Sequence, residues 1–374
     1  MRVWFNQWFS TAYHLIALMR AGSPDRFTFV GSSANPNMLY RLVCDAWETE
    51  PVLPVGTAYV EYALRFCRTQ GIDVFFPRRA LTLLAQHQDA FRVRGTILAA
   101  GAADTMALLD DKAATYAFFA EHLPEIVPAY RVARSYEAFV AAYEELRPCC
   151  ARVCYKLTED EGATTFRVID ESVAAPGAIA RKPGTKLTWA MAQQILRGYD
   201  FSVPFLLMPY LDGQEVSVDC LQTARGAIVI PRFKTDHRYS EIRFDADIMA
   251  LCERIMTLLQ IPVPINIQLR SDGTHYYLLE INPRMSGGLQ LSCLAAGINV
   301  PDIAVNRPKM RLLLALLAAF ILGGVVGAWG YHRLGYHFTL PVAALLFWFG
   351  AGSVGYDAKL RWRIYWRQKK RFER

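Results

Sequence analysis

The chain has 374 residues, of which 53% are hydrophobic and 20% are charged, and it carries a formal net charge of +7. This length allows two or three domains. The positive charge is local, because residues 357–374 hold eight Lys or Arg and only two Asp or Glu, which leaves the rest close to neutral. No basic stripe with interleaved aromatic residues occurs outside this tail, so we predict no nucleic-acid partner.

Eight cysteines are present, and none has the paired spacing of a metal site. Several fall within apolar strand or helix patterns, which predicts reduced, mostly buried thiols in a cytosolic domain. A metal site at the cluster of Cys149, Cys150 and Cys154 is the alternative.

Residues 1–100 alternate short apolar runs with helical patterns, which predicts a mostly parallel sheet with helices on its faces. The expected strands are 3–5, 27–31, 73–76 and 96–99, and the expected helices are 12–20 and 58–69. Arg78 and Arg79 follow the third of these strands, where open α/β sheets place ligands. A solvated charge pair is the alternative for these two arginines.

Residues 101–306 form a second α/β unit. The predicted helices are 105–122, 135–147 with Ser135 as N-cap, and 246–259. The predicted strands are 153–156, 165–169, 205–211, 214–219 and 227–233, followed by 266–270, which should pair with 276–281. The clean alternation of residues 214–219 is typical of a half-buried antiparallel strand.

The most informative segment is the end of the last strand, where Glu280, Asn282 and Arg284 follow an apolar run. Residues i and i+2 of a strand point the same way, so Glu280 and Asn282 present oxygen atoms to one spot. Oxygen ligands suit Mg²⁺, and the planar guanidinium of Arg284 suits phosphate. We predict a Mg-nucleotide site here; a buried strand with a surface arginine after it is the alternative. Gln268 shares a face with Asn266 and is a further candidate for the metal site.

Residues 307–374 predict a transmembrane hairpin with a basic tail. The segments 312–329 and 338–356 hold no charged residue over 18 and 19 positions, which is near the length that crosses a bilayer. Basic residues precede the first span and follow the second, so the positive-inside rule places the catalytic part and both termini in the cytoplasm. We therefore expect a multi-pass membrane protein; a buried helical hairpin of a soluble domain is the alternative.

Residues 1–305 resemble the ATP-grasp superfamily, most specifically over 266–288. In detail, residues 153–156, 166–168 and the ending with Glu280 are similar to ATP-grasp proteins associated with tellurite-resistance-type operons. The resemblance implies an α/β fold with a Rossmann-like pre-ATP-grasp domain at 1–100 and an α+β ATP-grasp domain at 101–306. It also implies ATP as cofactor with Mg²⁺, or Mn²⁺ in its place.

The resemblance assigns Lys112 and Lys156 to the nucleotide phosphates, and an exposed helical lysine is the alternative for Lys112. It assigns the backbone of Met208, Tyr210 and Leu211 to adenine recognition, with an ordinary core strand as the alternative. Glu215 matches a family residue that holds ribose or supports the metal.

The resemblance also places Arg232 and Lys234, with His237 and Arg238 close behind, toward the acyl phosphate or the acid substrate. Alternation puts Arg232 and Lys234 on one strand face, and solvated charge is the alternative for both. Asp219, on the same strand face as Glu215, is a candidate supporting partner.

The activity that the resemblance implies is ATP-dependent joining of a small carboxylic acid to an amine, or to a similar nucleophile, through an acyl phosphate. A homodimer is also compatible with it. One departure is the loop 157–164, which is glycine-rich in the family but here has one glycine and three acidic residues. A catalytically weakened nucleotide-binding regulatory membrane protein is therefore the alternative function. A transporter or channel is a third interpretation, which the absence of mid-span ionisable residues disfavours.

Overall fold

The computed structural model describes residues 1–160, 164–173, 184–224, 226–235 and 240–305. Met1–Val305 forms one compact unit. Both predicted membrane spans, 312–329 and 338–356, lie outside the described residues and stay predictions. Within the described ranges, no helix combines the length and apolar character that a membrane span needs.

The first sheet is parallel throughout and has the strand order β3-β2-β1-β4-β5. Its strands are β1 (Arg2–Asn6), β2 (Thr28–Ser33), β3 (Ala46–Thr49), β4 (Val74–Pro77) and β5 (Ile97–Leu98). Strand β3 is not among the predicted strands, because it is short, has two exposed residues and carries little apolar signal. The chain leaves β1 toward one edge of the sheet and β4 toward the other, so the sheet changes direction between these neighbours.

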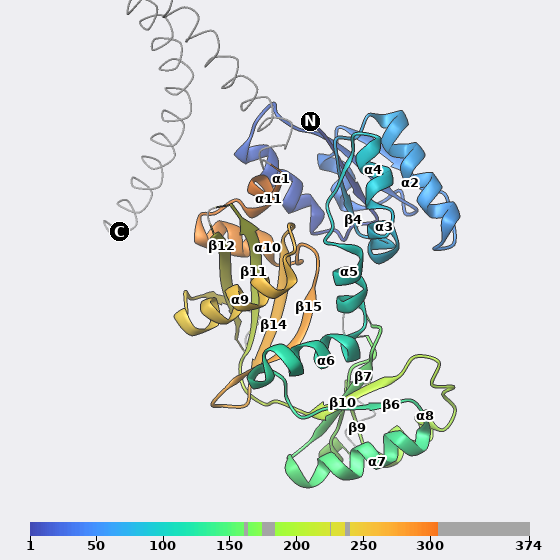
Figure 1. Cartoon of the computed structure of the whole chain (residues 1–374), viewed down its shortest axis with the longest axis vertical. Coiled ribbons are helices and arrows are strands. Elements are labelled where there is room, and N and C mark those ends of the chain that lie inside the picture. Colours follow the sequence, from blue (N-terminus) through green and yellow to red (C-terminus); the bar gives the residue numbers. More distant parts are fainter. Residues whose placement is uncertain (161–163, 174–183, 225, 236–239, 306–374) are drawn as a thin grey trace, which may run out of the picture. The chain divides into compact units, whose positions relative to one another are not determined.

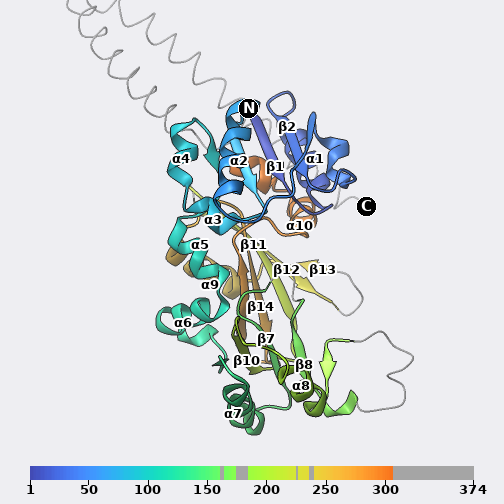
Figure 2. The same cartoon turned by 90° about the vertical axis from the view of Figure 1, so that its right-hand side faces the viewer.

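Helices cover both faces of the first sheet (Figures 1 and 2). The helix α1 (Ala12–Gly22) packs on the face that carries Phe5 and Phe29. The opposite face carries Trp4 and Phe75 and is covered by α2 (Thr57–Gln70), α3 (Leu81–Ala85) and α4 (Gln88–Val93). Both faces of a parallel sheet are expected to be buried in this way, and the predicted strand–helix alternation is confirmed.

The second sheet has the order β6-β10-β7-β8-β9. Its strands are β6 (Arg131–Ala133), β7 (Val153–Leu157), β8 (Arg167–Ile169), β9 (Lys186–Leu187) and β10 (Phe205–Pro209). The helices α7 (Tyr136–Leu146) and α8 (Trp189–Leu196) pack on one face. Ser135 caps α7 as predicted, because its hydroxyl accepts a hydrogen bond from the backbone N–H of Ala138.

The third sheet is antiparallel and has the order β13-β12-β11-β14-β15. Its strands are β11 (Glu215–Thr223), β12 (Gly226–Lys234), β13 (Ser240–Ile242), β14 (Ile265–Ser271) and β15 (Tyr276–Asn282). One face packs on α9 (Ala246–Leu259), and α10 (Leu289–Ala296) and α11 (Val300–Val305) follow β15. The predicted pairing of β14 with β15 is confirmed.

The predicted single helix over 105–122 is wrong, because the structure has two helices there. The helix α5 (Ala103–Asp110) ends before Asp111, and α6 (Lys112–His122) begins after it. Asp111 has an extended backbone, and its carboxylate accepts from the N–H groups of Ala113 and Ala114. Such a cap starts a new helix, and it makes Lys112 the first helical residue. Short 3₁₀ helices complete the described fold: Leu39–Val43, Pro124–Ile126, Arg147–Cys149 and Glu171–Val173.

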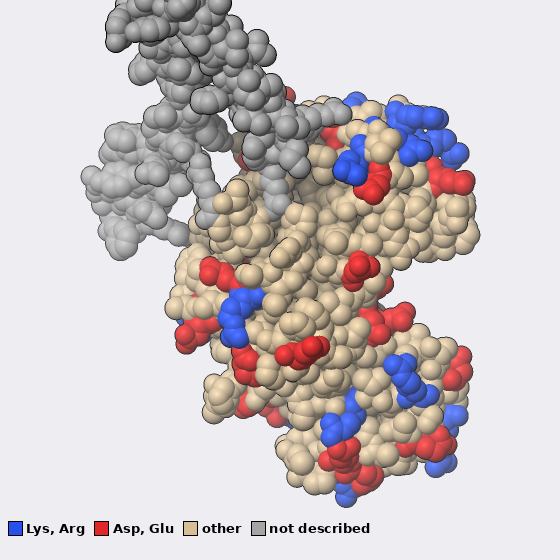
Figure 3. Space-filling model, viewed as in Figure 1, with Lys and Arg blue, Asp and Glu red and all other residues tan. Residues whose placement is uncertain are grey.

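All eight cysteines are free. On the face shown in Figure 3, Lys and Arg gather at the upper right of the described part, and elsewhere they are interspersed with Asp and Glu.

Candidate active site

The third sheet has one apolar face and one polar face, as period-two alternation requires. The apolar face carries residues such as Val216, Phe233 and Ile267 and packs on α9. The opposite surface, called here the polar face, consists of Glu215, Ser217, Asp219, Arg232, Lys234, Asn266, Gln268, Arg270, Glu280 and Asn282. The predicted metal and substrate residues of this sheet therefore share one surface.

Register brings the predicted metal ligands together. Gln268 pairs with Glu280, and Asn266 pairs with Asn282, on the neighbouring strands β14 and β15. The amide nitrogen of Asn282 donates to a Glu280 carboxylate oxygen at 3.1 Å, which directs the nitrogen toward Glu280 and leaves the amide oxygen as a further ligand atom.

This donor set fits Mg²⁺. One carboxylate and one amide oxygen stand at the strand end, and the described residues contain no group of three or more His, Cys, Asp or Glu that could hold a metal. Mg²⁺ is usually held by one or two carboxylates together with phosphate oxygens and water, rather than by a cage made only of protein ligands. Glu280 and Asn282 would hold the ion and Gln268 lies beside them.

A β-bulge shapes the strand just before Glu280. The register shifts between Gln268 and Leu269, so Leu279 is an extra residue in β15. A bulge leaves backbone groups outside the sheet ladder. Here the Leu279 carbonyl accepts from the Lys156 ammonium at 3.1 Å, and the Lys156 nitrogen lies 3.9 Å from a Glu280 oxygen.

Lys156 on β7 thus joins the second sheet to the third. Burial lowers the pKa of Lys156, and nearby Lys112 adds to this effect, whereas Glu280 opposes it. Tyr116 on α6 also contacts β15. Its hydroxyl donates to the Leu278 carbonyl at 2.8 Å and lies 3.2 Å from the Leu279 carbonyl oxygen. We call this set of four residues, Lys156, Tyr116, Leu279 and Glu280, the lobe contact.

Lys112 lies at the start of α6 and is buried. Its ammonium donates to the backbone carbonyl of Asp160 at 2.6 Å and lies 3.5 Å from that of Thr158. The Asp160 carboxylate accepts from the hydroxyls of Thr164 and Thr165, each at 2.6 Å. Burial raises the pKa of Asp160, but these hydrogen bonds and Lys112 outweigh it and the net pKa is lowered.

The Asp160 carboxylate is therefore engaged within its own loop by hydroxyl groups. Residues 161–163 of the predicted acidic loop lie outside the described residues, as do His237 and Arg238.

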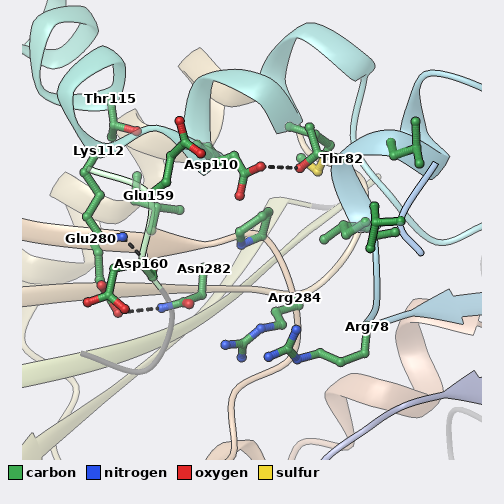
Figure 4. Close-up of a pocket in the computed structure, with 18 of the residues that line it drawn as sticks. Arg78, Thr82, Asp110, Lys112, Thr115, Glu159, Asp160, Glu280, Asn282 and Arg284 are labelled. Atoms are coloured by element: carbon green, nitrogen blue, oxygen red, sulfur yellow. Dashed lines mark hydrogen bonds between the residues drawn. The ribbon is translucent and has the colours of Figure 1, made fainter. Parts of the chain in front are cut away.

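A cavity of about 580 Å³ gathers four of the predicted residues. Lys112, Glu280, Asn282 and Arg284 line it. Lys156 is outside the lining and lies 3.9 Å from a Glu280 oxygen. Figure 4 shows Lys112 and Glu280 at one end of this space and Arg284 at the other. Lys112 shares its end of the cavity with Glu159, Asp160 and Glu280, Arg284 and Arg78 lie at the other end, and Asn282 lies between.

Arg78 is a site residue that the sequence analysis mentioned but did not assign. It follows β4 and lines the same cavity as Arg284. The guanidinium carbons of Arg78 and Arg284 lie 4.4 and 5.2 Å from the centroid of the Phe9 ring, in the range of cation–π contacts. In the sequence, the signal for a site role was the position of Arg78 directly after a predicted strand, where open α/β sheets bind ligands.

Arg232 lies elsewhere on the polar face, away from the cavity lining. It is 8% exposed, and its guanidinium donates to the Ser217 hydroxyl at 3.0 Å and lies 3.8 Å from an Asp219 oxygen. A Cβ on Gly288 would lie 2.5 Å from the guanidinium carbon, so a side chain at this position would have to displace the Arg232 guanidinium.

Asp219 is enclosed by three further donors. Its oxygens accept from Asn266 at 2.8 Å, Ser286 at 2.7 Å and Ser292 at 2.6 Å. We call Arg232, Asp219, Ser217, Asn266, Ser286 and Ser292 the buried arginine network. Ser286 follows Arg284 by two residues, so the network fastens the turn that carries Arg284 to the sheet.

The other predicted residues lie outside the cavity lining. Lys234 forms an ion pair with Glu215 at the far end of the polar face. Met208 and Leu211 are buried in an apolar cluster, and the Tyr210 ring lies between the guanidiniums of Arg152 and Arg270 at 4.8 and 4.9 Å. The assignments of these residues to substrate, ribose and adenine stay predictions.

Comparison with known proteins bears on the fold. A sequence model described as "ATP-grasp in the biosynthetic pathway with Ter operon" matches residues 201–312, which is less than half of the chain. The biotin carboxylase domain of 2-oxoglutarate carboxylase from Hydrogenobacter thermophilus, solved with MgADP and bicarbonate, aligns with a TM-score of 0.60 at 13% identity. That alignment covers 82% of this chain and 70% of the other.

The chain has an ATP-grasp fold. An L-amino acid ligase from Bacillus licheniformis aligns over 81% of this chain and 73% of its own, with a TM-score of 0.57 and 11% identity. A pyruvate carboxylase from Rhizobium etli aligns over 81% of this chain but only 28% of its own length, with a TM-score of 0.58 and 15% identity. This chain therefore spans about a quarter of that enzyme. No curated protein sequence matches the present chain.

The predicted ATP-grasp resemblance is confirmed for the fold. In this ATP-grasp fold the second and third sheets meet at the lobe contact, and the cavity lies beside it. Lys112 and Arg284 bring positive charge to this cavity from two different elements, and such charges suit phosphate.

Proposed function

We propose that this chain is an ATP- and Mg²⁺-dependent ligase that joins a carboxylic acid to an amine, or to a similar nucleophile, through an acyl phosphate. The observation that carries the proposal is the joint placement of Lys112, Glu280, Asn282 and Arg284 around one cavity. Cations suited to phosphate and oxygen ligands suited to Mg²⁺ meet there.

Each residue has a defined role in this proposal. Lys112 and Lys156 bind the nucleotide phosphates as point charges, and Arg284 offers a planar fork to the transferred phosphoryl group. Glu280 and Asn282 hold Mg²⁺, which offsets phosphate charge when bound. Met208, Tyr210 and Leu211 are proposed to present backbone to adenine, as the ATP-grasp resemblance implies.

The reaction has two displacements. A carboxylate oxygen of the acid attacks the γ-phosphorus of ATP, the bond to the β-phosphate oxygen breaks, and ADP leaves. The amine nitrogen then attacks the acyl carbon, inorganic phosphate leaves with the bonding electron pair, and the nitrogen loses a proton. The cationic residues lower both barriers by stabilising charge that is spread over the phosphoryl oxygens.

The lobe contact supports this role for Lys156. Burial lowers the pKa of Lys156, so the charged form of this lysine is less favoured than that of a solvated lysine. Phosphate then favours the charged form, so nucleotide binding and protonation of Lys156 reinforce one another.

The membrane hairpin at 307–374 and a cytoplasmic catalytic part complete the proposal, with the hairpin as an anchor. Its support is the uncharged length of 312–329 and 338–356 and the flanking basic residues. A homodimer is compatible with the proposal.

The alternative is a nucleotide-binding regulatory membrane protein with weakened catalysis. The single glycine in the loop 157–164 favours it, since few backbone N–H groups can then approach the phosphates closely. The engagement of Asp160 by Thr164 and Thr165 speaks against it, because this carboxylate is turned to its own loop.

The test is ADP release by the full chain with Mg-ATP and pooled carboxylic acids and amines. Glu280→Gln keeps the shape of the side chain but removes the charge, and Glu241→Gln on the exposed strand β13 is the matched control. We expect release that needs both pools, is lost in Glu280→Gln and is unchanged in Glu241→Gln. ATP binding without any release would instead support the regulatory alternative.

A further inference from the structure

The cavity that contains the proposed metal ligands is also lined by apolar side chains from the first sheet's connections and from α5. They come from the loop after β3, from the segment after β4 that includes α3, and from α5 itself. We call them the apolar wall: Val55, Ala80, Leu81, Leu83, Met106 and Leu109. None of these side chains has a charge or an oxygen atom, so the proposed binding of phosphate and Mg²⁺ leaves the wall without a role.

Part of the apolar wall is in contact with water. Val55 is 60% exposed, and Ala80, Leu81 and Leu83 are half-buried, with one side packed against the main core. An apolar group that displaces water from such side chains gains free energy. Small-molecule sites combine apolar walls with a few polar groups, and this cavity of about 580 Å³ lies within their usual range of about 300 to 1,000 Å³.

The parts of the wall are fixed relative to one another. The guanidinium of Arg79 donates to the Leu53 carbonyl, which fastens the loop after β3 to the loop after β4. The Thr82 hydroxyl donates to the Asp110 carboxylate at 3.1 Å and joins α3 to α5 (Figure 4). Ala80 has a left-handed φ of 55°, which persists in a non-glycine residue only where the surroundings fix it. The wall is therefore formed before any ligand binds.

The proposed reaction indicates which reactant this surface would meet. The acid must bring its carboxylate to the γ-phosphorus of ATP, beside Glu280 and Asn282, before the amine reacts. The rest of the acid then has to be accommodated in the same cavity, which the apolar wall lines.

We propose that the apolar wall binds the hydrocarbon part of the acid substrate. The inference rests on the proposed ligase function and narrows its substrate to carboxylic acids that carry an aliphatic or other apolar group beyond the reacting carboxylate. Only an acid long enough to reach side chains such as Val55 and Leu81 gains from this contact, so the wall selects for acid length.

The adenine ring is the other flat, largely apolar group that the cavity could receive. The ATP-grasp resemblance assigns adenine to Met208, Tyr210 and Leu211, and none of these residues lines the cavity. The proposal therefore leaves the wall to the acid, and the affinity for MgADP distinguishes the two assignments.

Two valines of one loop provide a matched comparison. Val52 and Val55 both lie in the loop between β3 and α2 and are 89% and 60% exposed. Val55 lines the cavity and Val52 does not. Replacing either by serine removes the same apolar surface from the same loop, but only Val55→Ser changes the wall.

The experiment measures binding of acetate, butyrate and hexanoate to the full chain, with and without saturating MgADP, by saturation-transfer nuclear magnetic resonance. We expect the affinity to rise about fourfold for each added CH₂ group, until the cavity is filled. Val55→Ser should weaken hexanoate about three- to tenfold and leave acetate unchanged, because only the longer acid reaches the wall. Val52→Ser should bind all three acids as the unmodified chain does.

Three outcomes would overturn the proposal: equal affinity for the three acids, an equal loss of hexanoate binding in Val52→Ser and Val55→Ser, or a loss of MgADP affinity in Val55→Ser. The last of these would assign the wall to the nucleotide. Failure of the unmodified chain to bind MgADP would count against the proposed function instead. The acid series without nucleotide would still report on the wall, so the two failures are distinguishable.

Discussion

Two cation–carboxylate pairs sit on the polar side of the third sheet, and their surroundings differ. In the buried arginine network, Arg232 lies 3.8 Å from Asp219; in the lobe contact, Lys156 lies 3.9 Å from Glu280. Asp219 accepts from three further side chains, whereas Glu280 accepts from Asn282 and borders the cavity. The two pairs therefore have similar separations but differ in how many side chains hydrogen-bond to the carboxylate.

The difference lies in how completely each charge is compensated. A buried ion pair offsets its desolvation only with added hydrogen bonds, and the arginine network supplies them from Ser217, Asn266, Ser286 and Ser292. The lobe contact leaves Lys156 with a lowered pKa. We infer that the first pair holds the turn of Arg284 in place and that the second is available to respond to a ligand.

The largest effect should come from breaking the arginine network. Arg232→Met leaves Asp219 buried without its cation and should lower the free energy of unfolding by about 3–5 kcal/mol. Denaturant unfolding followed by tryptophan fluorescence measures it. Adding Asp219→Asn should recover part of the loss, because the buried charge is then absent while an oxygen acceptor for the neighbouring donors remains. If Arg232→Met has the same free energy of unfolding as the original chain, the arginine network does not stabilise the fold, and the contrast with the lobe contact is wrong.

The lobe contact should instead affect binding. Lys156→Met removes a charge that meets phosphate, and we expect ATP affinity to fall about tenfold or more with a smaller change in stability than for Arg232→Met. Calorimetric titration with Mg-ATP measures the affinity. Lys186→Met, which removes an exposed lysine paired with Asp170 on the same sheet, serves as control and should bind ATP normally.

The lowered pKa of Lys156 predicts a proton linkage. Between the lowered pKa and the ordinary value of 10.5, Lys156 has lost its proton in the folded chain and has kept it in the unfolded chain. The free energy of unfolding should therefore gain from this group as pH rises through that window. ATP affinity should fall over the same window, because binding must first restore the charge, by at most about tenfold per pH unit.

Calorimetry in buffers of different ionisation enthalpy will detect this uptake of up to one proton. Lys156→Met should show no uptake from this group. Identical proton uptake in the variant and the original chain would mean that another group is responsible.

The smallest effect concerns Tyr116. Tyr116→Phe removes the hydroxyl that reaches the Leu278 and Leu279 carbonyls and should cost about 1 kcal/mol of stability. Tyr130→Phe alters a half-buried ring that meets Tyr116 edge to face, and should cost less. Thermal unfolding measures the melting temperature of both variants. Equal decreases would show that the Tyr116 hydroxyl contributes no more to stability than the Tyr130 hydroxyl does.

Much of the third sheet could be predicted from sequence because its signals are local. Period-two alternation set Glu280 and Asn282 on one face, and the short connection between 266–270 and 276–281 favoured their pairing. Lys112 was assigned by resemblance alone, and its place at a helix start depends on the cap at Asp111, which a continuous helical pattern concealed.

The burial of Arg232 could not be predicted, since it depends on partners from β11, α10 and the turn at Ser286. The meeting of Arg78 with Arg284 joins residues about two hundred positions apart, and alternation carries no information over that distance. The bulge at Leu279 could not be predicted either, because an extra apolar residue does not interrupt the run of apolar residues in the sequence.

That bulge has a consequence for engineering. Leu278 faces α9 and Glu280 faces the opposite side, so a chain lacking Leu279 would restore an unbroken ladder and still direct Glu280 and Asn282 to the polar face. The shortened strand would lose the carbonyl that accepts from Lys156 and the Leu279 side chain that borders the cavity, whereas Tyr116 would keep its hydrogen bond to the Leu278 carbonyl. One deletion would thus test the contact between the two sheets while the metal ligands keep their face.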